Sequence, residues 1–137
     1  MDFYTIDASV VIKWVSRQRE QQLVKARDLY KQAVEGKIKL VAPSLLQVEV
    51  SNILLKKKKL KPNTIVKLWQ LINEAMILYV DLSETILKKS LSLAEKHDLS
   101  VYDGLYLAIA HESKTKLISA DVKGHGKIGE VVLLENW

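Results

Sequence analysis

The sequence has no cysteine, and it has only three histidines, two prolines and five glycines among its 137 residues. Without cysteine the chain can form no disulfide, no thiolate zinc site and no thiol nucleophile. Any chemistry must therefore use carboxylates, histidines, hydroxyls or amines. No segment is rich in proline, glycine or serine, so we expect a single domain that spans residues 1–137.

The chain also lacks a long apolar run. Its longest stretch without a charged residue is nine residues, Leu40 to Val48, whereas a membrane-spanning helix needs about 18 apolar residues. The first residues show neither the basic region nor the cleavage site of a signal peptide. We therefore expect a protein that does not enter the membrane and works in the reducing cytoplasm.

Two features of the sequence suggest other chemistry, but each lacks the surrounding structure or spacing that this chemistry needs. Gly124 to Gly129 matches the dinucleotide fingerprint G-x-G-x-x-G, but that fingerprint works only where a helix begins inside it, and here a strand is expected from Val131. His97, His111 and His125 form no H-E-x-x-H pair. We expect neither nucleotide binding at this loop nor a histidine metal site.

Positive charge is concentrated in the first half of the chain. Residues 1–69 carry 14 basic and 6 acidic side chains, and residues 70–137 carry 7 and 10, for a net charge of +5. Such an asymmetry permits a polyanionic partner. The densest segment, Lys56 to Lys61, is either a solvated helix end, where cations suit the helix dipole, or a patch that contacts phosphates.

Strands and helices alternate along the chain. Short apolar runs without clean alternation predict buried parallel strands at Phe3–Ile6, Lys39–Ala42, Ile77–Val80, Lys116–Ser119 and Val131–Leu134. Helical spacing predicts helices over Ala8–Ser16, Glu20–Glu35, Ser44–Lys57, Pro62–Asn73, Ser83–Lys96 and Ser100–Ser113. This alternation predicts an α/β fold with right-handed crossovers. The Ser44–Gln47 and Ser100–Asp103 segments both match the capping-box pattern.

Two aspartates follow predicted strands. Asp7 comes directly after Phe3–Ile6, and Asp121 comes just after Lys116–Ser119. The carboxyl ends of parallel strands share one edge of the sheet, where sites form. Taken separately, Asp7 could be only the N-cap of the next helix, and Asp121 only a turn residue.

Two further acids lie on inward faces of predicted helices. Glu49 shares the stripe of Leu45 and Ile53, where an uncompensated carboxylate would be costly, and Asn52 is its polar companion on that face. Asp103 precedes Tyr106 at i+3, which turns it toward the packed face, although it could also serve only the start of its helix.

Together these acids predict a pocket for a hard divalent metal. None of the four has a lysine or arginine next to it in the sequence. Mg²⁺ and Mn²⁺ prefer oxygen ligands, and clustered carboxylates repel one another unless a cation neutralises them. We expect Asp7, Asp103 and Asp121 to hold one or two ions and Glu49 to complete the acidic ring.

At these positions the sequence resembles the PIN-domain nucleases, and most closely the VapC-type ribonuclease toxins of prokaryotic toxin–antitoxin pairs. Ile6-Asp7-Ala8-Ser9-Val10-Val11 is similar to the opening strand of that family with its first acid. Glu49-Val-Ser-Asn52-Ile-Leu54 resembles the helix with the second acid. Leu99 to Ala108, which contains Asp103, resembles the segment with the third acid. Leu117 to Asp121 resembles the strand that ends in the fourth acid.

The resemblance implies a Rossmann-like three-layer α/β/α sandwich, a homodimer, and Mg²⁺- or Mn²⁺-dependent cleavage of RNA. Asp7, Glu49, Asp103 and Asp121 would be the catalytic acids, with Ser9, Asn52 and Ser119 in support. A cognate antitoxin would cover the site. The apolar side chains Leu68, Trp69, Leu71 and Ile72 are candidates for the dimer surface, or they belong to ordinary core packing.

Two other functions stay open at this point. The chain could be an RNA-binding module that has kept the fold without turnover. It could also be an RNA-processing enzyme or a DNA nuclease built on the same acidic site.

Overall fold

The computed structural model describes residues 1–16, 22–121, 128–129 and 131–137. The described strands are β1 (Asp2–Ile6), β2 (Ile38–Pro43), β3 (Leu78–Val80), β4 (Lys116–Ser119) and β5 (Val131–Leu133). The helices are α1 (Ala8–Val15), α2 (Leu23–Val34), α3 (Leu45–Lys56), α4 (Pro62–Ile72), α5 (Glu84–His97) and α6 (Val101–Ser113), with short 3₁₀ turns η1 (Asn73–Ala75) and η2 (Leu134–Asn136). The predicted elements agree with these to within three residues over the described ranges.

The five strands form one parallel sheet in the order β3-β2-β1-β4-β5. The chain moves outward from β1 to β3 and then returns to β4 on the other side of β1. The strand order therefore reverses between β1 and β4, which is the position where open α/β sheets place their sites.

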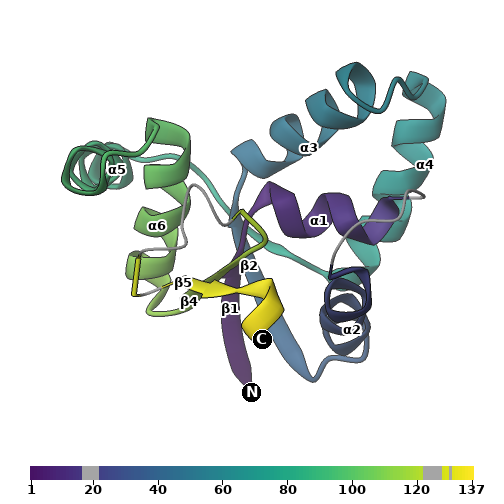
Figure 1. Cartoon of the computed structure of the whole chain (residues 1–137), viewed down its shortest axis with the longest axis horizontal. Coiled ribbons are helices and arrows are strands. Elements are labelled where there is room, and N and C mark those ends of the chain that lie inside the picture. Colours follow the sequence, from purple (N-terminus) through teal and green to yellow (C-terminus); the bar gives the residue numbers. More distant parts are fainter. Residues whose placement is uncertain (17–21, 122–127, 130) are drawn as a thin grey trace.

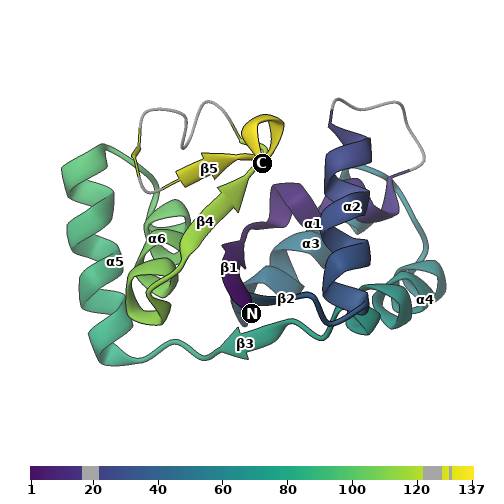
Figure 2. The same ribbon diagram turned by 90° about the horizontal axis from the view of Figure 1, so that it is seen from below.

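Helices cover both faces of the sheet (Figures 1 and 2). On one face α6 packs on β1, β2 and β4, and α5 packs on α6. On the other face α1 and α2 lie against the sheet, and α3 and α4 pack beside α1. This arrangement confirms the predicted three-layer α/β/α sandwich.

The core consists of aliphatic side chains from every layer. Ile6, Leu40 and Ile118 from the sheet and Leu46 and Leu107 from the helices have no exposed surface. Strands buried on both faces explain why the sequence shows apolar runs in place of alternation. None of the described helices is both long enough and apolar enough to cross a membrane.

One predicted cap is wrong and one is confirmed. Ser44 has helical backbone angles and makes no side-chain cap, because its hydroxyl donates instead to Oδ1 of Asp81, at 2.5 Å. Ser100 does cap α6, since its Oγ accepts a hydrogen bond from the backbone N–H of Asp103 at 3.1 Å. Most of the loop from Gly124 to Gly129, and the start of the helix predicted from Glu20, lie outside the described residues.

Candidate active site

The carboxyl ends of β1 and β4 bring Asp7 and Asp121 to the same edge of the sheet. Asp7 follows β1 and caps α1, with its Oδ1 accepting a hydrogen bond from the backbone N–H of Ser9 at 3.1 Å. Asp121 lies two residues beyond the end of β4, the neighbouring strand. The cap interpretation of Asp7 is therefore confirmed, and it is compatible with a place in a site.

Two serines fix the carboxylate of Asp7. Ser9 Oγ donates to its Oδ1, and Ser119 Oγ donates to its Oδ2, both at 2.5 Å. The same hydroxyls accept hydrogen bonds from backbone N–H groups of the β4 end, Ser9 from Ala120 at 2.9 Å and Ser119 from Asp121 at 3.0 Å. Asp7 is only 6% exposed. The carboxyl group is thus held in one orientation by Ser9 from the first turn of α1 and Ser119 from the end of β4.

Glu49 reaches this region from α3. The side chain is half-buried, and no described group forms a hydrogen bond of ordinary geometry with its buried Oε1. Burial raises the pKa of Glu49 to about 7, and the negative charges of Asp7 and Asp103 raise it further in the same direction. The Tyr106 hydroxyl lowers this pKa slightly. Three of the four predicted acids therefore share one electrostatic environment.

Asp103 lies in the first turn of α6 and is half-buried. Its charge, from α6, raises the pKa of Glu49 on α3. Asn52, one turn after Glu49 on α3, is exposed at the surface. The structure thus relates Asp7, Glu49 and Asp103 through their charges, and it connects Asp121 to Asp7 through Ser119.

Tyr106 also belongs to this region, although the sequence pattern indicates only that it lies on the packed face of its helix. It is 2% exposed, and its hydroxyl has no hydrogen-bond partner of ordinary geometry among the described groups. Burial raises its pKa, and the charges of Glu49, Asp7 and Asp103 raise it further. The hydroxyl stays protonated and can donate. The available signal was its spacing of three residues from Asp103, which puts both on one helix face.

The donor atoms of this region suit a hard divalent cation. They are carboxylate and hydroxyl oxygens, and the buried Oε1 of Glu49 has the Tyr106 hydroxyl near it but no hydrogen bond of ordinary geometry among the described groups. Within the described ranges no three His, Cys, Asp or Glu side chains form a ready-made metal site. An ion here would take one or two carboxylates and complete its coordination with water and substrate oxygens, as Mg²⁺ commonly does.

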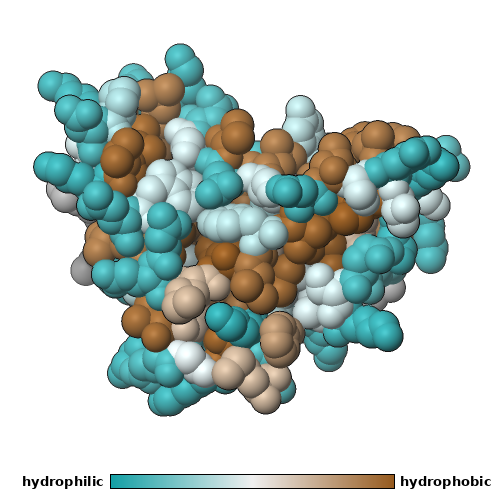
Figure 3. Space-filling view, turned by 180° about the vertical axis from the view of Figure 1, so that it is seen from behind, coloured by the Kyte–Doolittle hydropathy of each residue, from teal (hydrophilic) through white to brown (hydrophobic). Residues whose placement is uncertain are grey.

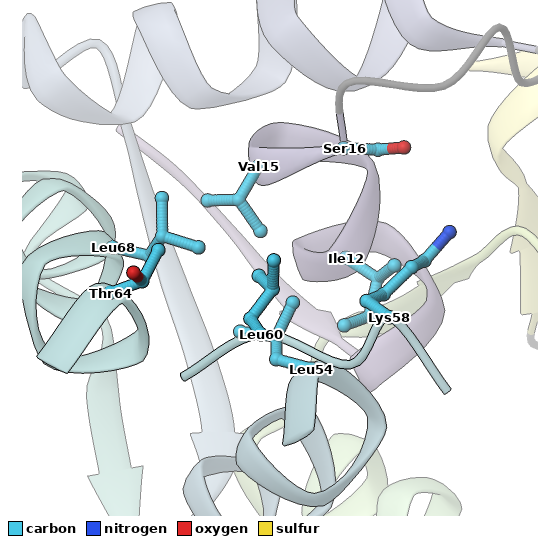
Figure 4. Close-up of a pocket in the computed structure, with 8 residues that line it drawn as sticks. All are labelled: Ile12, Val15, Ser16, Leu54, Lys58, Leu60, Thr64 and Leu68. Atoms are coloured by element: carbon cyan, nitrogen blue, oxygen red, sulfur yellow. The ribbon is translucent and has the colours of Figure 1, made fainter. Parts of the chain in front are cut away.

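An apolar cavity of about 380 Å³ lies away from these carboxylates, among α1, α3 and α4. Figure 4 shows Ile12 and Val15 of α1 facing Leu54, Leu60 and Leu68 across it. None of the described residues that line this cavity is acidic. It therefore takes no part in the chemistry of the acidic region.

A family model described as the PIN domain matches residues 4–129. The chain belongs to the PIN domain family. PIN domains are nucleases, and the acids of this chain lie at the sheet edge where the strand order reverses. No curated protein sequence matches the chain.

Solved structures with the same PIN fold include toxin–antitoxin proteins. A toxin–antitoxin complex from Klebsiella pneumoniae is 22% identical, with a TM-score of 0.65 over 96% of this chain and 97% of that one. VapBC2 from Rickettsia felis, bound to a DNA fragment from its promoter, is 14% identical, with a TM-score of 0.71 over 98% of both chains. Mycobacterium tuberculosis VapC20, described as a sarcin–ricin loop cleaving toxin, is 10% identical, with a TM-score of 0.68 over 89% of this chain and 91% of that one. At these identities the likeness shows the fold.

Proposed function

We propose that this PIN domain is a metal-dependent endoribonuclease and the toxin of a VapBC-type toxin–antitoxin pair. The observation that carries the proposal is the arrangement of three acids from three separate elements: the charges of Asp7 and Asp103 act on the half-buried carboxyl group of Glu49. Such a cluster costs stability unless a cation neutralises it. At the carboxyl edge of the sheet Asp7 is 6% exposed, while Glu49 and Asp103 keep part of their surface exposed.

In this proposal Asp7, Asp103 and Asp121 hold Mg²⁺ or Mn²⁺, directly or through water. The bound ion would lower the pKa of its water and offset the charge that builds on the phosphate. Ser9 and Ser119 keep the Asp7 carboxylate oriented toward that position. Glu49, with a pKa of about 7, is poised to accept the proton of the attacking water near neutral pH.

An antitoxin partner is the second part of the proposal. The support is the toxin–antitoxin origin of the solved structures that share the fold. An arginine or lysine of such a partner, placed among the carboxylates, would pair with them and exclude the metal. The partner's cation would then take the place of the metal ion and inhibit the enzyme. The gene for such a partner is expected in a small reading frame next to this one.

We also propose a homodimer. Of the four α4 residues for which the sequence left a dimer surface or core packing open, Ile72 is fully buried and Leu68 and Trp69 pack partly against the core, so core packing accounts for three of them. Figure 3 shows apolar side chains gathered over the middle of the face opposite to that of Figure 1. The segment from β3 to the start of α5 crosses this face (Figure 2), and Leu78 and Leu82 are 46% and 59% exposed. We place the dimer contact there.

The substrate test uses purified protein and three competing substrates: single-stranded RNA, single-stranded DNA and flap DNA. With Mn²⁺ present we expect cleavage of RNA, and with EDTA we expect none. Preferred cleavage of DNA would show that the protein is a DNA nuclease and would contradict the ribonuclease proposal. RNA binding that is indifferent to Mn²⁺ and EDTA, without cleavage, would mean a binding module.

A further inference from the structure

One flank of α3 continues from Glu49 to the end of the helix. Asn52 and Lys56 follow Glu49 by three and seven residues, and at about 100° per residue they lie within about 60° of its direction around the helix axis. Leu46, Val50 and Leu54 form the buried stripe beside this flank. Asn52 and Lys56 are both exposed. The flank therefore leads from the acidic region to the surface.

The lysines at the end of α3 lie on different sides of the helix end. Lys58 is half-buried and lines the apolar cavity with Ile12 and Leu54 (Figure 4). Lys57 is exposed but is turned by about 100° from Lys56 around the helix. Lys56 is the one lysine that lies within α3, and it continues the flank of Glu49. The sequence alone presents these residues as one uniform cluster.

The separation between Lys56 and Glu49 allows the two residues to contact different nucleotides of one RNA strand. Seven residues at a rise of about 1.5 Å place Lys56 about 10 Å from Glu49 along the axis. None of the ion pairs between described residues includes Lys56. When one phosphate of the strand is held at the carboxylates, the ammonium group of Lys56 can bind the phosphate of another nucleotide in the same strand. Lysine binds phosphates as a compact charge and reads no base sequence.

We propose that the α3 flank formed by Glu49, Asn52 and Lys56 is a subsite for the backbone of single-stranded RNA. Lys56 binds the phosphate of a nucleotide next to the cleaved one, and the Asn52 amide contacts the backbone between Lys56 and the acids. This inference rests on the proposed ribonuclease function. It assigns the two residues a role in holding the strand and none in the chemical step.

The competing explanation is that Lys56 only stabilises the carboxyl end of α3 through the helix dipole. Lys57, the next residue in the chain, also lies at that end and serves as a matched control. Lys56→Ala and Lys57→Ala remove the same charge from the same helix end. They differ in whether the charge lies on the flank of Glu49.

The experiment measures RNA binding against salt concentration, between about 50 and 200 mM. Each lysine variant is made in an Asp7→Asn background to prevent cleavage, and both are compared with the Asp7→Asn protein. For a single strand, losing one phosphate contact should reduce the slope of log K against log salt by about 0.7. We expect this reduction for Lys56→Ala, and an unchanged slope for Lys57→Ala. Thermal melting checks that both variants fold alike.

Cleavage kinetics of the lysine variants with Asp7 intact give the second readout. Lys56→Ala should raise the KM for a long RNA without changing kcat, and it should leave cleavage of a dinucleotide unchanged because that substrate is too short to reach Lys56. Equal effects of the two variants, or no effect of either, would overturn the subsite while leaving the ribonuclease proposal intact. A wild-type protein that neither binds nor cleaves RNA would overturn both.

Discussion

Ser119 donates a hydrogen bond from its hydroxyl to Oδ2 of Asp7, and the two residues are 112 positions apart in the chain. The contact joins the carboxyl ends of β4 and β1, the strands between which the sheet order reverses. Because the same hydroxyl accepts from the N–H of Asp121, one serine sets the orientation of the first acid and the local backbone of the fourth. The orientation of the Asp7 carboxylate and of the backbone at Asp121 therefore depends on the neutral side chain of Ser119.

Replacing Ser119 by alanine should impair activity more than stability. The substitution removes the hydroxyl that orients Asp7, and loss of such a partner to a metal-binding carboxylate typically costs about 10- to 100-fold in metal affinity or activity. The expected result is a higher Mn²⁺ concentration for half-maximal cleavage, with the overall fold retained. Metal titration of RNA cleavage measures it.

Two comparisons make this prediction specific. Ser119→Thr keeps a hydroxyl at the same position and should retain most of the activity. Ser92→Ala, at an exposed position on α5, removes a serine from a helix that carries none of the four acids and should change nothing. An Mn²⁺ dependence of Ser119→Ala equal to that of the wild type would show that the hydrogen bond to Asp7 has no functional role.

Glu49 should make the metal-free protein less stable as the pH rises. Its folded-state pKa of about 7 lies above the ordinary value of 4.5, so folding favours the protonated form. The stability contributed by this group is fully present below about pH 4.5 and is lost as the pH rises toward and through 7. Allowing for its partial exposure, the loss is of the order of 1–2 kcal/mol.

Glu49→Gln removes this titration and tests the sign. In EDTA the variant should be more stable than the wild type at pH 8, and the difference should shrink toward pH 4.5. Chemical denaturation at several pH values measures the free energy of unfolding of both proteins. A wild type that gains stability relative to Glu49→Gln as the pH rises would contradict the raised pKa.

Gly104 is required for the close packing of α5 on α6. A Cβ at this position would overlap the carbonyl oxygen of Ser90 and lie 3.1 Å from Cβ of Ala94. Because one of these neighbours is backbone, α6 would have to move, and we expect Gly104→Ala to cost about 1–3 kcal/mol of stability. The shift would also displace the adjacent Asp103.

Denaturant unfolding of Gly104→Ala tests this packing. Gly129→Ala is the matched control, because a Cβ there meets nothing within 4 Å. We expect the control to unfold at the wild-type denaturant concentration. If both variants unfold alike, the close approach of the two helices does not limit stability.

The strands and helices could be predicted from the sequence because each carries a local signal. Apolar runs marked the strands, and helical spacing marked the helices to within a few residues. The Ser44 cap was predicted wrongly because the competing acceptor, Asp81, is distant in the sequence and only the fold brings it close. Local patterns contain no information about such a contact.

The candidate site shows the same division. Asp7 and Asp121 could be placed at one sheet edge by topology, and Ser9 could be paired with Asp7 by proximity in the chain. The role of Tyr106 could not be predicted, because a tyrosine on a buried helix face is ordinary core until its hydroxyl is found near Glu49. For Ile72 the sequence left a dimer surface and core packing open, and the structure shows that it is fully buried.

The most direct test of the account is the rate of RNA cleavage in Mn²⁺ by Asp7→Asn, compared with the wild type and with Asp28→Asn. Asparagine can still cap α1, so the first variant should fold normally. Asp28 is an exposed acid on α2 that serves as the control. We predict a loss of at least about 100-fold for Asp7→Asn and wild-type rates for Asp28→Asn, with no cleavage by any of the proteins in EDTA. A folded Asp7→Asn protein that cleaves RNA at the wild-type rate would contradict the account.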